Sequence, residues 1–291
     1  MTTTLGYLLG RVCSQKSNLL TNADWQKFQT AKGLTDWLPR LHNTPYAAAS
    51  EQAETYEQFE KCLHQELADL RRDLFEGDDV VAEIFWRKYD WHNLKILLKE
   101  KLTGQELEYY LLPLGKNTLT DFDQQLLEKA LEVYAQTQDF CRLDYFLDQE
   151  YFTWLKKKSS KLGAEVKAYV RAQIDAANFK LWYSGAHEEY SYFAGGQVPL
   201  NFFTEDTPEK ILPKCFPNIE LPKEINEGII EKVLDDYAVK LLFRKYYSYN
   251  LTTIFCFLQA KENEIKNLKT MYLRQSRELP VLQNYLRYTH G

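Results

Sequence analysis

A six-residue pattern occurs three times in this chain and constrains the fold more than any other feature of the sequence. The copies occupy residues 90–95, 175–180 and 264–269, and each reads acid, two variable residues, Asn, a large apolar residue and Lys. They start 85 and 89 residues apart in a chain of 291 residues. Recurrence at a nearly constant long period indicates a repeated structural unit. The repeated polar residues are Asp90, Asn93, Lys95, Asp175, Asn178, Lys180, Glu264, Asn267 and Lys269.

Each copy lies in a segment whose apolar residues follow the period of a helix. Around the first copy the apolar stripe consists of Trp91, Leu94, Leu98 and Leu102, which fall at i, i+3, i+7 and i+11. The acid and the Asn are three residues apart, so both flank this stripe on one side. The motif helices are predicted over residues 81–102, 165–184 and 251–275.

Asn is disfavoured inside helices because its amide competes for local backbone hydrogen bonds. Its return in all three copies predicts a specific partner, such as a carbonyl or a loop of the same unit. One hypothesis is a threefold polar site lined by the motif residues. The other is a structural hydrogen bond that pins the helices of each unit, and it is favoured because a carboxamide and a Lys at this spacing match no catalytic template.

The remaining segments predict helices as well. Long helical patterns cover residues 47–75 and 224–247, and the sequence contains neither Asn-Gly nor Asp-Gly, the strongest hairpin signals. We therefore predict an all-α protein of three similar helical units, with boundaries at 1–110, 111–198 and 199–291. Such units can pack as three wedges about a pseudo-threefold axis or as a linear array.

Charge and cysteine content exclude several classes of protein. A net charge of −5 and a pI near 5.7 argue against nucleic-acid binding, which requires a basic surface. The five Cys are scattered without a Cys-x-x-Cys pair, which favours buried thiols in a reducing cytoplasm over disulfides or a zinc site. The first residues lack a basic region followed by a long apolar core, and no run of 18 apolar residues occurs, so we expect neither a signal peptide nor a membrane-spanning helix. Membrane association is therefore expected only through a partner.

The sequence lacks the common motifs of catalysis and cofactor binding. It contains no Gly-x-Gly-x-x-Gly, no Gly-x-x-x-x-Gly-Lys-Ser/Thr, no Gly-x-Ser-x-Gly and no His-Glu-x-x-His. His187, Glu188 and Glu189 could offer metal ligands, although a charged loop or helix end is the favoured interpretation. We predict no catalytic, cofactor-binding or metal-binding residue. The alternatives that stay open are a helical-repeat adaptor and an enzyme with an unrecognised site near His187.

Five elements of the sequence resemble those of the C subunit of bacterial and archaeal V/A-type ATPases, the relative of the d subunit of eukaryotic V-ATPases. They are residues 7–12, the triplet Thr44-Pro45-Tyr46, the repeats beginning at Tyr89 and Ile174, and residues 258–269, which carry the third copy. The resemblance covers nearly the whole chain. The departures are small, since Phe179 replaces an aliphatic residue and Glu264 replaces Asp.

This resemblance implies an all-helical funnel of three similar domains that acts as a rotor connector. It implies as partners the D and F subunits of the central shaft and the proteolipid (c/K) ring, at the cytoplasmic face of the membrane. It also implies that the chain neither binds nor hydrolyses nucleotide and takes no cofactor. The motif does not fix the contact residues, and the transported ion, proton or sodium, is a property of other subunits.

Overall fold

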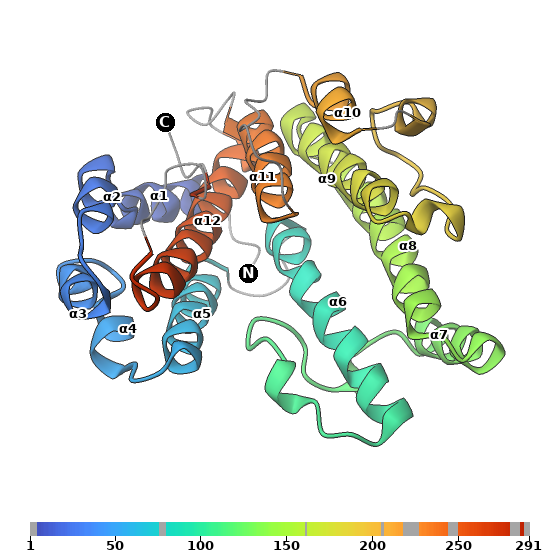
Figure 1. Cartoon of the computed structure of the whole chain (residues 1–291), viewed down its shortest axis with the longest axis horizontal. Helices are drawn as coiled ribbons and strands as arrows, with labels where there is room; N and C mark the ends of the chain where they lie inside the picture. Colours follow the sequence, from blue (N-terminus) through green and yellow to red (C-terminus); the bar gives the residue numbers. More distant parts are fainter. Residues whose placement is uncertain are drawn as a thin grey trace.

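The computed structural model describes residues 5–75, 80–160, 162–204, 207–217, 227–243, 250–279 and 286–287. Within these ranges the chain consists of α-helices, short 3-10 helices and connecting loops, without any strand (Figure 1). The all-α prediction is therefore confirmed. The α-helices are α1 (Leu5–Gln15), α2 (Asn22–Gln29), α3 (Leu34–Trp37), α4 (Ala47–Gln52), α5 (Tyr56–Leu74), α6 (Val80–Thr103), α7 (Gln124–Thr137), α8 (Phe140–Ser159), α9 (Ala164–Tyr183), α10 (Pro208–Cys215), α11 (Glu227–Phe243) and α12 (Leu251–Gln275).

The three motif helices form where the periodicity predicts them. They are α6, α9 and α12, and their ends agree with the predicted ranges to within one residue. The prediction for 47–75 is wrong in one respect, because the chain breaks into α4 and α5. Thr55 and Gln58 exchange hydrogen bonds in a capping box that starts α5. Of the helix predicted over 224–247, only α11 lies within the described residues.

Helix α12 runs through the centre of the largest hydrophobic cluster. Every residue from 252 to 265 is buried, as expected for a helix covered on all sides. Near its end, the ring of Tyr272 lies 4.7 Å from Phe59 of α5 and 6.3 Å from Trp37 of α3. Because α1 also packs on α12, the first helices of the chain and the last one share a core.

Two smaller clusters complete the interior. In the second, the later half of α6, with Trp91, Leu94 and Leu98, packs on α7 and α8. In the third, Phe179 of α9 packs on α10 and α11. We refer to unit I (α12 with α1–α5), unit II (the later half of α6 with α7 and α8) and unit III (α9–α11). The first halves of α6 and α9 belong to the largest cluster, so the packing changes within these two helices, after Tyr89 and after Ile174. The division at residues 110 and 198 stays a prediction.

Candidate functional site: helix–loop contacts and buried charges

The first motif copy binds the loop that follows α6. Asn93 is fully buried, and its side-chain amide pairs with both backbone groups of one residue: Nδ2 donates to the Leu112 carbonyl (2.9 Å) and Oδ1 accepts from the Leu112 N–H (2.8 Å). Asp90 accepts from the backbone N–H of Lys116 (3.0 Å). Gly115 precedes that residue, and a Cβ there would lie 2.5 Å from the Tyr89 carbonyl oxygen. The loop can approach α6 this closely only with glycine at that position.

The second copy repeats this arrangement on the loop after α9. Asn178, also fully buried, pairs with the backbone carbonyl (3.0 Å) and N–H (2.7 Å) of Phe193. Asp175 accepts from the backbone N–H groups of Gln197 (2.9 Å) and Val198 (3.1 Å). Gly196 stands in the place of Gly115, and a Cβ there would lie 1.9 Å from Oδ1 of Asp175.

The third copy keeps the Asn contact but changes the partner of the acid. Asn267 pairs with the backbone carbonyl (2.9 Å) and N–H (2.7 Å) of Arg287. Glu264, however, reaches back to the start of the chain, where it accepts from the Leu20 N–H and from the Tyr46 hydroxyl (2.8 Å). Burial raises the pKa of Glu264, although Lys261 and the Tyr46 hydroxyl stabilise its charged form. The third copy therefore fastens α12 to the connecting segments that precede α2 and α4.

The motif Lys makes an interhelical ion pair in each unit. Lys95 pairs with Asp148 of α8 (2.6 Å) and Lys180 with Glu231 of α11 (2.7 Å), while Lys269 pairs with Glu60 of α5. Among the described residues, no hydrogen bond or ion pair joins one copy of the motif to another. The structure therefore places the nine motif residues at three separate helix–loop–helix contacts.

A chain of paired charges crosses from α6 through α12 to α11, in which Glu262 is buried and Lys88, Lys266 and Asp235 are partly exposed. Glu262 of α12 accepts from Lys88 of α6 and lies 3.5 Å from Lys266, and Lys266 lies 3.3 Å from Asp235 of α11. Asp235 also pairs with Arg287 (2.8 Å). Burial alone would raise the pKa of Glu262, but Lys266 and Lys88 outweigh it and lower that pKa to about 2. The pairing keeps Glu262 ionised inside the protein, where an unpaired charge would be costly.

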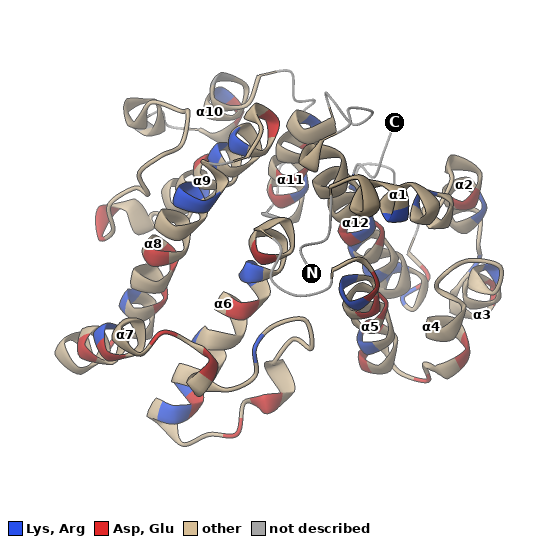
Figure 2. Cartoon of the chain, turned by 180° about the vertical axis from the view of Figure 1, so that it is seen from behind, with Lys and Arg blue, Asp and Glu red and all other residues tan. Residues whose placement is uncertain are grey.

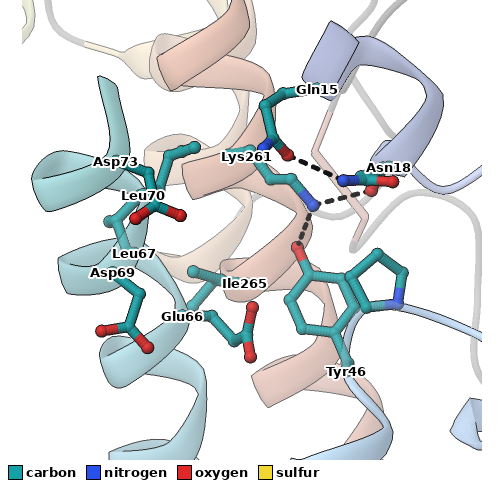
Figure 3. Close-up of a pocket in the computed structure, with 11 residues that line it drawn as sticks. Gln15, Asn18, Tyr46, Glu66, Leu67, Asp69, Leu70, Asp73, Lys261 and Ile265 are labelled. Carbon is teal, nitrogen blue, oxygen red and sulfur yellow. Dashed lines mark hydrogen bonds between the residues drawn. The ribbon is translucent and has the colours of Figure 1, made fainter. Parts of the chain in front are cut away.

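A second buried charge lies beside a small cavity of about 90 Å³ (Figure 3). Lys261 points from α12 to the backbone carbonyl of Asn18 (2.8 Å) and to the Tyr46 hydroxyl (3.3 Å). Figure 3 shows Glu66 and Asp69 on the α5 side of the same cavity. Since Lys261 is fully engaged by its neighbours, the cavity is best described as part of the packing between α5, α12 and residue 46.

The described residues contain no group of three or more His, Cys, Asp or Glu side chains suited to a metal ion. His187 lies in a short 3-10 turn, where its ring stacks on Tyr192 at 6.0 Å. All five Cys are free, but Cys13 and Cys141 are exposed, so the prediction of buried thiols is correct only for Cys215 and Cys256. Within the ranges given above, no helix has the length and apolar character needed to cross a bilayer.

Comparison with known proteins gives a consistent result. The family model described as ATP synthase (C/AC39) subunit matches residues 8–273. The C subunit of the V-type sodium ATPase of Enterococcus hirae is 22% identical over 259 residues, which cover 75% of this chain and 79% of that protein. The C subunit of the A-type ATP synthase of Methanocaldococcus jannaschii is 23% identical over an aligned length of 327 residues, with coverage of 91% and 81%.

Proposed function

The chain belongs to the ATP synthase (C/AC39) subunit family, and from this membership we propose that it is the central connector of a V/A-type ATPase. Members of the family are non-catalytic components of that complex, so the chain works in assembly with other ATPase subunits. In this proposal, the D and F subunits of the shaft bind one side of the protein and the proteolipid ring binds the other. The three units surround a pseudo-threefold funnel at the cytoplasmic face of the membrane, and the protein transmits torque between its two partners.

The observation that best supports this role is the repeated fastening of each motif helix. A torque-transmitting connector must resist twisting between its helices, and close-packed interiors transmit strain. In every unit, a buried Asn joins the motif helix to a loop and a Lys joins it to a second helix. These contacts oppose sliding and rotation of the helices, whereas they supply no group for chemistry.

The test is recovery of the complex from native membranes. The tagged chain is expressed in its own organism, the membranes are gently solubilised, and the proteins that copurify are identified by mass spectrometry, with a tagged unrelated protein as control. We expect the shaft subunits and the proteolipid ring to copurify with the chain. Recovery of soluble proteins without either partner would reject the connector role and favour a helical-repeat adaptor.

A further inference from the structure

The three motif helices meet ahead of their motifs and separate after them. The buried apolar residues of α6 and α9 belong to the largest cluster up to Tyr89 and Ile174, and to the second and third clusters beyond. Where the helices meet, the ring of Phe255 of α12 lies 5.9 Å from Phe85 of α6 and 5.4 Å from Tyr169 of α9. In both views α6 and α12 come together at one end and diverge toward the other (Figures 1 and 2). We call this meeting region the branch point.

The residue two positions before the motif acid lies at the branch point in each helix. These positions hold Lys88, Gln173 and Glu262, which are a cation, a neutral amide and an anion. Like charges brought together by converging helices would repel one another. In this chain the charges are opposite, so Lys88 and Glu262 attract each other across α6 and α12.

Glu262 begins a hydrogen-bonded network that reaches all three motif helices. It accepts from Lys88 of α6 and from Nε2 of Gln259 (3.2 Å), which lies one turn earlier on α12. Oε1 of Gln259 accepts from the Tyr169 hydroxyl of α9 (2.7 Å), and that hydroxyl accepts from Nε2 of Gln173 (2.6 Å). The network is therefore continuous from α6 through α12 to α9.

Two further groups tie Glu262 to its surroundings. The Tyr89 hydroxyl of α6 donates to it, and burial together with the charge of Glu262 raises the pKa of Tyr89. On the other side, Lys266 lies 3.5 Å from Glu262 and 3.3 Å from Asp235 of α11. Glu262 is thus linked directly to α6 and, through one intervening side chain each, to α9 and α11.

Among the residues that the structure describes, four carboxylates are buried, and Glu262 differs from the other three. The others are the motif acids Asp90, Asp175 and Glu264, which bind loops or connecting segments. Of the four, Glu262 alone pairs with a different motif helix. A buried charge that loses its partner is strongly destabilising. Any movement of α6 that separated Lys88 from Glu262 would therefore be opposed.

We propose that Glu262 is a positioning residue, which fixes the angles at which α6 and α9 leave α12 and so places units II and III relative to unit I. The inference concerns the chain by itself and does not depend on the connector role. The second and third clusters lie beyond the branch point, so they do not require the network. Loss of the Glu262 carboxylate therefore loosens the units against one another while each unit stays folded.

Two exposed thiols allow the placement of the units to be measured in the full chain. Cys13 lies on α1 in unit I and Cys141 on α8 in unit II, and Cys62→Ser removes the partly exposed third thiol. Spin labels on this pair give the distribution of distances between units I and II by double electron–electron resonance. For unit III, the label on Cys13 is combined with one on Lys210→Cys, an exposed position of α10, in a chain that also carries Cys141→Ser.

The test variant is Glu262→Gln, and the matched control is Glu264→Gln. Glu264 is fully buried on the same helix, but its partners Leu20 and Tyr46 precede α2 and α4 in unit I. In the Glu262 variant we expect both distance distributions to broaden and their maxima to shift. In the control we expect both to match the wild type, although it also loses a buried charge. Circular dichroism verifies that the variants are folded.

Lys88→Met provides a second variant. Because Lys88 lies on α6, which leads into unit II, we expect this change to alter the distances between units I and II and to leave those to unit III unchanged. Unaltered distances in the Glu262 variant, or equal broadening in the Glu262 and Glu264 variants, would reject the positioning role. If the Glu262 variant does not fold, the Lys88 variant decides. Unchanged distances between units I and II, or equal changes in both pairs, would then reject it.

Discussion

Replacing Asn178 by Ala tests whether the buried Asn of the motif fastens a loop to its helix. Asn178 is fully buried and exchanges two hydrogen bonds with the backbone of Phe193, which is itself 6% exposed. Ala removes both bonds and leaves a buried N–H and a buried carbonyl without partners. A buried backbone group left unpaired costs about 1–3 kcal/mol. We therefore expect the free energy that holds this loop closed to fall by about 2–4 kcal/mol.

Hydrogen exchange of the peptide spanning residues 190–198 measures this loss directly. Because about 1.4 kcal/mol corresponds to a tenfold change in an equilibrium constant, exchange through loop opening should accelerate about 30-fold to several hundredfold. The control is Asn22→Ala, an exposed Asn on α2, which should leave exchange in this peptide unchanged. Acceleration of less than about fivefold in the Asn178 variant would contradict the proposed role of the amide.

Three further predictions concern other contacts. Tyr46→Phe removes the hydroxyl that donates to Glu264 (2.8 Å), and urea unfolding should show a loss of about 1–3 kcal/mol. Gly196→Ala places a Cβ 1.9 Å from Asp175 Oδ1, so the Tm should fall, whereas an unchanged Tm would mean that the loop yields freely. Burial lowers the pKa of His64 from 6.5 to about 4. Between pH 6.5 and 4, the unfolded chain therefore takes up a proton that the folded chain does not. The free energy of unfolding falls by up to about 3 kcal/mol as the pH drops through that range. The His64→Gln variant should lack this part of the pH dependence.

The helices and the motif are accessible to sequence reasoning because they depend on local periodicity. The ends of α12, for example, follow from apolar spacing and from Asn250, whose side chain caps the first turn. The interior break between α4 and α5 does not follow from periodicity, although Thr55 and Gln58 form a capping box that the sequence displays. The capping box therefore determines where α5 begins, although the apolar pattern continues through this position.

The partners of the motif depend on contacts between distant segments. The sequence indicates that Asn93 and Asn178 need a loop or carbonyl but cannot select Leu112 or Phe193. Two glycines could have indicated which loop binds the motif. Gly115 and Gly196 each directly precede the residue whose backbone N–H donates to the motif acid. Nothing local predicts that Glu264 binds Tyr46, because 218 residues separate them.

Contacts and exposures that arise only on folding are likewise invisible in the sequence. The high exposure of Tyr109 and Tyr110, for example, follows from the fold and not from any local pattern. The pairing of Lys88 with Glu262 cannot be predicted for the same reason, since the two residues lie on different helices 174 positions apart.

The sharing of unit I between α1–α5 and α12 has a consequence for how the protein is made. When α5 leaves the ribosome, the helix that its apolar face will cover has not been synthesised, and about 200 residues must follow before α12 ends. At about 5–20 residues per second this takes roughly 10–40 s. Units II and III can assemble during that interval, whereas Phe59 and Trp37 cannot pack on Tyr272 until α12 has been synthesised. The nascent chain therefore carries an exposed apolar surface that chaperones can bind until its last long helix arrives.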